Sequence, residues 1–475
     1  MNRSPGAASS SDFWLAAARV AFANPFSEEF PASAPRVEAE FAQRISRLDQ
    51  AGATHLRRYR AEERATMRTV FLFDACRRFS ADFDKLIVAQ SKKEEGSLPV
   101  PFANDLLGLL SRRGIEGGEA VRALGIFFQI RRAHHFIAGE LIGQSASMRR
   151  LRRDLWNNVF THDMHFYERS LWNRMDDFST LLSGETGTGK ATVAAAIARS
   201  GFIPFDEKKR AFAESFTRGF LPFNLSQYPA PLIEFELFGN PKGAGANEAH
   251  EGVFTRCSPF GAVFLDEIDQ IPPPLQVKLL RVLQERVFSP VGSRDLIPFR
   301  GRVIAATDKP IEKLRGREGL RDDLYYRLCS DAIILPTLRA RLAEDRQELD
   351  GLLSHLIARM GGDPAGALLP LVRSALGSLL DLNYAWPGNV RELEQAVRRI
   401  ILTRRYPGET SEVPPDDVTQ LNAGVSAGSL NAEELLSRYC ALLYSRCGNL
   451  EEVARRTDLD RRTVKRYLAQ SGLRK

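Results

Sequence analysis

The chain has 475 residues, of which 44% are hydrophobic and 26% are charged, and its formal net charge is +7. This length exceeds what one hydrophobic core supports, so several folded domains are expected, while the composition excludes a chain that is disordered throughout. A membrane span is not expected, because no apolar run reaches about 18–20 residues. A secretion signal is not expected, because the N-terminus lacks a charged start before an apolar stretch. A disulfide framework is not expected, because the five cysteines form no CxxC pair.

Residues 1–138 are predicted to form a mostly helical N-terminal regulatory region of unknown function. Apolar residues recur there at helical spacing, for example in FDACRRFSADFDKLIVAQ, but no motif indicates a ligand. Residues 139–345 instead alternate helical patterns with short apolar runs, namely FSTLLSGETGTGK, GFLPFNLS, AVFLDEID and GRVIAATD. This alternation predicts an α/β domain with a parallel sheet and flanking helices.

The C-terminal part is predicted to contain a lid, a linker and a small helical domain. Residues 346–405 show helical patterns that are interrupted at 386–389 by WPGN, where Pro and Gly end one helix and Asn begins the next. Residues 406–430 are rich in Pro, Gly, Ser and acids, which is typical of a linker. Residues 431–475 form a short basic module.

A nucleotide-binding loop is predicted at 184–190, where GETGTGK follows an apolar strand and precedes a helix-forming run. Its glycines let backbone N–H groups surround phosphate oxygens, and Lys190 reaches the outer phosphates. Position 191 lacks the hydroxyl that usually binds Mg²⁺, and Thr192 is rotated from it by about 100° on the helix. The alternative is a glycine-rich turn that binds no nucleotide. The predicted nucleotide-binding residues of the loop are Gly184, Glu185, Thr186, Gly187, Thr188, Gly189, Lys190 and Ala191.

Two acidic residues end the apolar run 262–265. Carboxylates at the C-terminal edge of a parallel sheet lie beside bound phosphates. Asp266 would therefore bind Mg²⁺, directly or through water, and Glu267 would polarise the water that attacks ATP. Apolar runs that end in acids are common by chance, so this prediction depends on the pairing with the P-loop.

From 141 to 393 the chain resembles the central domain of the sigma-54-dependent activators, the bacterial enhancer-binding proteins of the AAA+ class. A Fis-like helix-turn-helix at the end completes the family layout. The resemblance implies an AAA+ α/β fold with a helical lid, a bacterial cytoplasmic protein, and ATP with Mg²⁺ as ligands. It is carried by ELFG at 236–239, LRVLQE at 280–285, IAAT at 304–307, DLYYRL at 323–328 and WPGNVREL at 386–393.

The resemblance also implies roles for individual residues. Arg321 and Arg327 correspond to arginine fingers that reach the ATP of a neighbouring subunit, so the site is complete only in a ring, typically a hexamer. Arg391 corresponds to the lid arginine that senses the γ-phosphate, and Asn224 to the residue that restrains Glu267. The alternative for the arginines is an ordinary surface ion pair.

Three departures from the family pattern bear on mechanism. The family's GAFTGA loop, which touches the sigma factor, aligns with GAGANE at 243–248, so the Phe and Thr of that contact are missing. This argues against contact with sigma-54, while RNA polymerase holoenzyme stays a candidate partner. Asp308 replaces the family's Asn, and a carboxylate near the γ-phosphate predicts slow hydrolysis. Extra residues within 157–178 and an elongated connection at 201–219 have no role that the sequence indicates.

A helix-turn-helix is predicted within 431–475. Helical patterns cover 431–447, 450–456 and 460–470, and Asp460 is a good N-cap for the last of them. Val464 and Leu468 share one face, and the rest of this helix is basic, as in a recognition helix that enters the DNA major groove. The alternative is a solvated basic helix that only caps the C-terminus. The predicted DNA-binding residues are Arg461, Arg462, Thr463, Lys465 and Arg466.

Two weaker motifs favour structural roles. His162, His165 and Glu168 have a spacing that could place metal ligands on one helix face, but surface or core positions are the preferred interpretation. Tyr325 and Tyr326 are predicted to pack in the core or at a subunit interface.

Two functions follow from these observations. The first is an ATP-dependent transcription regulator that binds DNA and hydrolyses ATP. It forms a homo-oligomer, which is either a hexameric ring or a dimer precursor of one. The second is a DNA-binding regulator in which nucleotide only controls assembly. Two features favour this second function: the GAFTGA loop is lost, and Asp308 is present where the family has Asn. A third possibility is an AAA+ machine unrelated to transcription. The predicted catalytic residues are Glu267, Asp266, Arg321, Arg327, Asn224 and Asp308.

Overall fold

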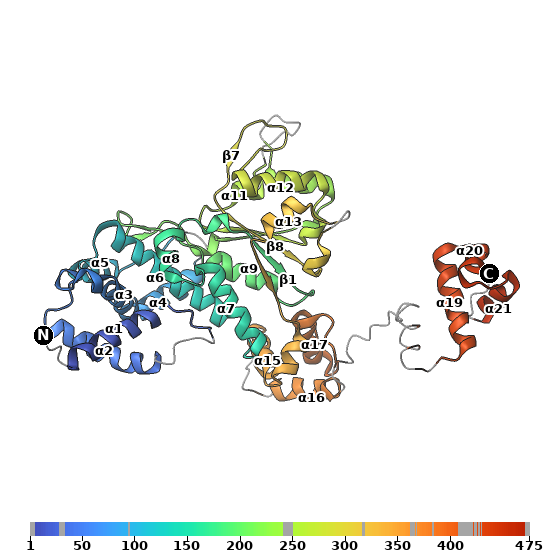
Figure 1. Ribbon diagram of the computed structural model, residues 1–475, viewed down its shortest axis with the longest axis horizontal. Coiled ribbons are helices and arrows are strands. Elements are labelled where there is room, and N and C mark those ends of the chain that lie inside the picture. Colours follow the sequence, from blue (N-terminus) through green and yellow to red (C-terminus); the bar gives the residue numbers. More distant parts are fainter. Residues whose placement is uncertain are drawn as a thin grey trace. The chain divides into compact units, whose positions relative to one another are not determined.

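The computed structural model forms two compact units, Met1–Tyr406 and Pro407–Lys475 (Figure 1). The structure describes residues 5–27, 34–93, 96–240, 250–315, 319–361, 366, 368–381, 384–406, 421, 425, 428 and 430–470. Among these residues, no helix combines the length and the apolar character that crossing a membrane requires.

Helices build the N-terminal part of the first unit, as the spacing of apolar residues predicts. In α2 (Ala34–Gln50), Val37, Phe41 and Ile45 recur every four residues and are all buried, so one stripe of the helix faces the core. The other helices of this part are α1 (Pro5–Val20), η1 (Leu56–Arg58), α3 (Ala61–Arg78), α4 (Ser80–Ser91), α5 (Ala103–Arg112) and α6 (Gly117–Gly139).

A five-stranded parallel sheet forms the centre of the first unit, with the strand order β4-β5-β8-β1-β9. Four strands coincide with the predicted apolar runs: β1 (Thr180–Ser183), β4 (Phe220–Asn224), β5 (Ala262–Asp266) and β8 (Arg302–Thr307). The edge strand β9 (Asp331–Ile334) was not predicted, although the short apolar run before Pro336 was a signal for it. The predicted α/β fold class with flanking helices is confirmed.

Alternation along the strands divides the interior of the sheet domain into two cores. In β5, Val263 and Leu265 face one core, and Ala262 and Phe264 face the other. The first core lies under α10 (Ala230–Phe238), α11 (Val253–Arg256), α12 (Pro273–Glu285) and α13 (Asp322–Leu328). The second lies under α7 (Ala146–Phe160) and α9 (Lys190–Arg199). Both faces of the sheet are therefore covered, as a parallel sheet requires.

Short elements connect these layers. They are α8 (Met164–Phe166), η2 (Tyr167–Leu171), η3 (Met175–Asp177), η4 (Phe216–Arg218), η5 (Leu225–Gln227), η6 (Ile268–Gln270) and η7 (Ile311–Lys313), and the two-residue strand pairs β2 (Phe205–Asp206) with β3 (Ala211–Phe212) and β6 (Val287–Phe288) with β7 (Ile297–Pro298).

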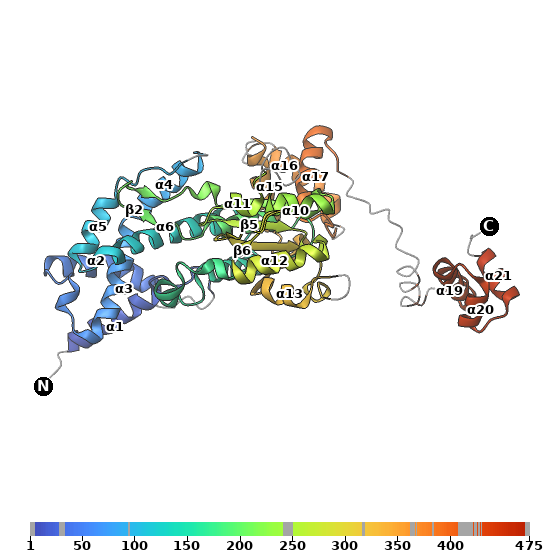
Figure 2. The same cartoon turned by 90° about the horizontal axis from the view of Figure 1, so that it is seen from above.

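A helical lid follows the sheet domain and packs around a core of its own. Trp386, which is 1% exposed, is the largest of its buried side chains. The lid helices are α14 (Leu338–Glu344), α15 (Glu348–Arg359), α16 (Leu368–Asp381) and α17 (Asn389–Thr403). Of these, α15, α16 and α17 lie side by side (Figure 2).

The N-terminal helices share one hydrophobic core with the elongated connection at 201–219. Phe128 of α6 stacks on Phe212 of β3, with the ring centroids 3.8 Å apart and an interplanar angle of 13°. Val100 N donates to Arg210 O at 2.9 Å, which joins the backbones of the two segments. The connection therefore completes the core of the N-terminal region, a role that the sequence did not indicate.

The second elongated stretch, within 157–178, also packs on α6. Tyr167 is fully buried, and its hydroxyl donates to Oε1 of Gln129 at 2.7 Å. Glu168 forms an ion pair with Arg68 of α3. Both stretches thus serve the contact between the sheet domain and the N-terminal helices.

The second unit contains three short helices around a small core. They are α19 (Ala432–Cys447), α20 (Leu450–Thr457) and α21 (Arg461–Gln470). Cys440, Val453 and Val464, one from each helix, are fully buried together.

Candidate functional site

The P-loop connects β1 directly to α9, which begins at Lys190. Gly187 and Gly189 adopt positive φ values of 80° and 99°, a region that favours glycine. At Gly187 the requirement is also steric, because a Cβ there would lie 2.1 Å from the carbonyl oxygen of Gly388 in the lid. The loop is therefore shaped both by its own turn and by close contact with the lid.

Lys190 lies at the centre of the predicted site. Its Nζ donates to the carbonyl oxygens of Gly184 at 2.7 Å and Glu185 at 3.3 Å. Burial lowers the pKa of Lys190, and the nearby carboxylates of Asp266 and Asp308 oppose that shift. The structure thus brings the lysine and these two acids together.

Four neighbouring strands end at this site in sheet order. Asn224 ends β4, Asp266 ends β5, Asp308 follows β8, and the P-loop follows β1. Asn224 is the direct register partner of Asp266. Because parallel strands present their carboxyl ends along one edge, residues that are distant in sequence meet at the P-loop.

Asp266 and Glu267 differ in environment. Burial raises the pKa of Asp266, while the positive charge of Lys190 opposes the shift. Glu267 adopts a left-handed backbone, with φ 56° and ψ 49°, which is uncommon for a residue other than glycine and is concentrated at functional sites. Nδ2 of Asn224 donates to Oε1 of Glu267 at 3.5 Å, so the two residues are adjacent, as predicted.

Asn389 is a residue of this site to which sequence analysis gave no role beyond starting a helix. It is fully buried with φ 53°, and its Oδ1 accepts from the backbone N–H of Leu338 at 2.8 Å. Its Nδ2 donates to Thr186 O at 3.0 Å and to the Glu185 carboxylate at 3.2 Å. The amide of Asn389 therefore joins the lid to the P-loop.

A second unpredicted contact supports the same junction. Arg339 of α14 forms a two-pronged ion pair with Glu185, which lowers the pKa of that carboxyl. Next to it, Val390 N donates to Gly187 O at 3.1 Å. The WPGN segment marks this region in the sequence, but its spacing does not indicate which residues it contacts.

The predicted arginines have distinct surroundings within one chain. Arg391 lies beside the P-loop, since a Cβ built at Gly187 would be 3.0 Å from the Cβ of Arg391. Arg321 pairs with Asp323 through two contacts of 3.1 and 2.8 Å and is half exposed. Arg327 donates to the carbonyl oxygen of Leu283 at 3.1 and 2.9 Å.

The segment that aligns with the GAFTGA loop, 243–248, lies outside the described residues. The residues on either side of 241–249 are described. Asn240 and His250 exchange two backbone hydrogen bonds, of 3.0 and 3.1 Å.

The candidate metal ligands on the helix at 162–168 do not come together. His162 and His165 are exposed, and Glu168 is held by Arg68. In the part of the chain that the structure describes, no group of three His, Cys, Asp or Glu side chains could hold a metal ion. Tyr325 and Tyr326 pack edge to face at 5.5 Å, and Tyr326 is 64% exposed.

The candidate DNA-binding residues lie on α21. The carboxylate of Asp460 accepts the backbone N–H groups of Arg462 at 2.8 Å and Thr463 at 3.0 Å, so the predicted N-cap is confirmed. Val464 is buried, whereas the four basic side chains of this helix, Arg461, Arg462, Lys465 and Arg466, are exposed.

A parallel sheet with a P-loop after β1, acids after β5 and a helical lid on the loop defines a P-loop protein of the AAA+ class. A family model described as the Sigma-54 interaction domain matches residues 161–333. The regulatory protein AtoC from Escherichia coli (strain K12) is 31% identical over 334 residues, which cover 67% of this chain and 68% of AtoC. The chain belongs to the family of sigma-54-dependent transcriptional activators.

Other relatives are similar over comparable lengths. The C4-dicarboxylate transport transcriptional regulatory protein DctD from Rhizobium meliloti (strain 1021) is 31% identical over 383 residues, which cover 78% of this chain and 73% of DctD. Among solved structures, NtrX from Brucella abortus is similar with a TM-score of 0.42 and 20% identity, over 78% of this chain and 80% of that one.

Proposed function

We propose that this chain is an ATP-dependent transcription regulator. It binds DNA through 431–475, assembles through the 141–400 core, and hydrolyses ATP to act on a transcription partner. The observation that carries this proposal is the meeting of Lys190, Asp266 and Glu267 at one edge of the sheet. These are the charges that phosphoryl transfer requires.

The residues at this edge suit a triphosphate with its metal. The backbone of 184–190 and the N-terminus of α9 provide N–H donors and a positive dipole end, and Lys190 adds a full charge. Asp266 would hold Mg²⁺, which neutralises phosphate charge when bound. Although Ala191 has no hydroxyl, one carboxylate is sufficient, because Mg²⁺ in nucleotide sites keeps several waters.

Glu267 would orient the attacking water, and Asn224 would restrain it through their 3.5 Å contact. Arg391 would sense the γ-phosphate from the lid. Arg321 and Arg327 would serve a neighbouring subunit, which requires each to leave its present partner, Asp323 or the Leu283 carbonyl.

Steady-state ATP turnover of the purified chain tests the enzyme. We expect Lys190→Ala and Glu267→Gln each to reduce kcat by about 10²–10³-fold, the usual cost of losing one charge-stabilising group. Lys208→Ala is a matched control, because Lys208 is an exposed lysine outside the site. Turnover that survives both site substitutions would refute the proposal.

Subunit mixing tests the shared site. If Arg327 acts in a neighbour, Arg327→Ala and Glu267→Gln impair different halves of the same site. A mixture of the two inactive variants should then regain turnover, because some interfaces receive both intact halves. A mixture that stays inactive, with assembly verified by light scattering, contradicts sharing.

DNA binding is tested by gel shifts with the DNA upstream of the chain's own gene, at several salt concentrations. Arg462→Ala and Lys465→Ala should weaken binding and reduce the salt slope by about 0.9 for each phosphate that the variant no longer neutralises. Arg455→Ala is the control, because this arginine lies on α20 and pairs with Glu452. Equal effects of all three substitutions would contradict a recognition helix.

Asp308 favours a second candidate function, in which nucleotide binds but only controls assembly. Its carboxylate acts on Lys190 beside that of Asp266, so negative charge accumulates where the γ-phosphate would lie. In this case ATP binds without turnover, and Asp308→Asn should establish hydrolysis. This second function excludes contact with sigma-54, because the Phe and Thr of the family loop are absent from 243–248, and activation of a sigma-54 promoter in vitro would contradict it.

A further inference from the structure

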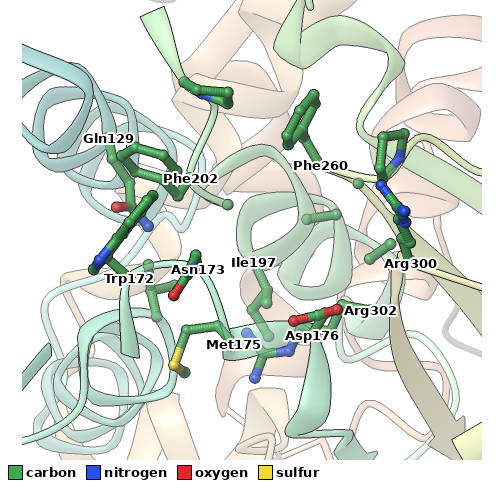
Figure 3. Close-up of a pocket in the computed structure, with 17 residues that line it drawn as sticks. Gln129, Trp172, Asn173, Met175, Asp176, Ile197, Phe202, Phe260, Arg300 and Arg302 are labelled. Carbon is green, nitrogen blue, oxygen red and sulfur yellow. The ribbon is translucent and has the colours of Figure 1, made fainter. Parts of the chain in front are cut away.

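A cavity of about 560 Å³ lies in the first unit between α6, residues 172–176, the C-terminal end of α9 and the starts of β5 and β8 (Figure 3). It is distinct from the nucleotide site, because β5 and β8 begin here and carry Asp266 and Asp308 only at their opposite ends. Its volume lies within the range of about 300–1,000 Å³ that is typical of small-molecule sites.

The stretches 157–178 and 201–219 contribute about half of the residues that line this cavity, among them Trp172, Asp176 and Phe202. The rest of the lining comes from α6, α9 and the segments that lead into β5 and β8. The cavity therefore lies where these two stretches meet the sheet domain.

The lining combines aromatic rings with one available cation. Trp172 and Phe202 pack edge to face with centroids 4.8 Å apart, and Phe260 lies apart from them in the same cavity (Figure 3). Arg300 is exposed and forms no ion pair with any residue that the structure describes.

The other charged groups of the lining are already engaged. Arg302 donates to Phe178 O at 2.8 Å and to Thr180 Oγ1 at 2.9 Å. Asp176 accepts from Arg286 at 2.9 Å. Gln129 is also satisfied, through Ser200 and Tyr167. Arg300 is thus the group in this cavity that can meet a ligand's charge.

We propose that this cavity binds a small aromatic carboxylate. The ring would lie among Trp172, Phe202 and Phe260, and the carboxylate would pair with the guanidinium of Arg300, whose planar donors match a carboxylate. The ligand would contact Ile197 and Ala198 at the end of α9, the helix that begins at the P-loop.

Isothermal titration calorimetry on the full chain tests this site with two probes that share one ring system, 2-naphthoate and 2-naphthalenemethanol. We expect 2-naphthoate to bind at least about tenfold more tightly than the neutral alcohol, since only the acid can form a charge-assisted contact. Equal affinities, or no binding of 2-naphthoate up to millimolar concentration, would overturn the proposal.

Substitutions locate the binding. Arg300→Gln should remove the tenfold preference and leave the affinity for the alcohol unchanged. Arg294→Gln is the matched control, because Arg294 is an exposed arginine outside the cavity. Lys190→Ala should keep the preference for 2-naphthoate, because Lys190 does not line this cavity. A defect in the nucleotide site therefore does not change the outcome of the binding test. Loss of the preference in Arg294→Gln, or its persistence in Arg300→Gln, would contradict the assignment.

Discussion

Asp266 illustrates how a functional carboxylate affects the stability of the protein that carries it. Burial raises its pKa above the unfolded value, so the ionised carboxylate destabilises the folded state at neutral pH. This cost shrinks as the pH falls through the folded pKa and is gone below the unfolded pKa, because the group is then protonated in both states. The candidate site therefore contains an acid that lowers the stability of the folded state at neutral pH.

We predict that Asp266→Asn raises the Tm of the nucleotide-free protein at pH 7–8 by roughly 2–4 °C. The gain should shrink as the pH falls, because the wild-type carboxyl, whose pKa is raised by burial, then becomes neutral in the folded state. The same substitution should abolish Mg²⁺-dependent ATP turnover. Differential scanning calorimetry from pH 4 to 8 measures the first effect, and a Tm gain that does not depend on pH would contradict its cause.

Asn389 combines a left-handed backbone with one side-chain hydrogen bond inside the lid, to Leu338 N, and two that join the lid to the P-loop, at Glu185 and Thr186. Asn389→Ala should destabilise the first unit by about 2–3 kcal/mol, because it strains the backbone and leaves Leu338 N unpaired. Asn389→Gly removes the same hydrogen bonds, but glycine adopts the left-handed backbone conformation without strain. The difference between the two variants in chemical denaturation measures the strain, and both should weaken ATP binding in calorimetry.

At the scale of elements, the junction between α6 and α9 connects the N-terminal region to the P-loop helix. The guanidinium of Arg132 is fully buried and donates to Arg199 O and Gly201 O, each at 2.6 Å. Gln129 donates to Ser200 O at 3.0 Å. Side chains of α6 therefore satisfy the carbonyl groups at the C-terminus of α9, which no intrahelical donor can reach.

Arg132→Met should cost about 1–3 kcal/mol, because it leaves the buried carbonyl groups of Arg199 and Gly201 without their donors. Arg131→Met is the control on the same helix, since Arg131 pairs with the partly exposed Asp84 and should contribute at most about 1 kcal/mol. Urea denaturation of both variants checks the difference. Similar losses would show that the α9 terminus does not depend on Arg132.

Local patterns predicted the strands that carry the site, but not all of its neighbours. Strands β1, β4, β5 and β8 were visible as apolar runs, and the P-loop was visible as a motif. Strand β9 is as short as β1, with four residues, but unlike β1 it is followed by no motif that marks it. The contacts of Arg132 span 67 and 69 residues and leave no periodic trace, so only the folded chain shows them.

At the scale of the whole molecule, the first unit cannot be divided at residue 138 without exposing its interior. Ile203, Phe205, Phe212 and Phe216 of the connection at 201–219 belong to the same core as the N-terminal helices. The N-terminal helices and the connection at 201–219 thus share one hydrophobic core.

We predict that deletion of 1–138 yields a protein that aggregates or binds 8-anilinonaphthalene-1-sulfonate strongly, because these apolar side chains lose their partners. Deletion of 407–475 is the control, since it removes the separate second unit and should leave the Tm of the first unchanged. A monodisperse truncated protein with unchanged Tm would show that the connection refolds on its own.

The shared core also sets an order of events on the ribosome. The N-terminal helices emerge first, but the phenylalanines that complete their packing lie beyond residue 200. At about 5–20 residues per second, roughly 4–16 s pass between the emergence of α6 and of Phe216. During that delay the nascent chain displays apolar surface to chaperones, and the speed of translation across 139–216 becomes a determinant of how much protein reaches the native state.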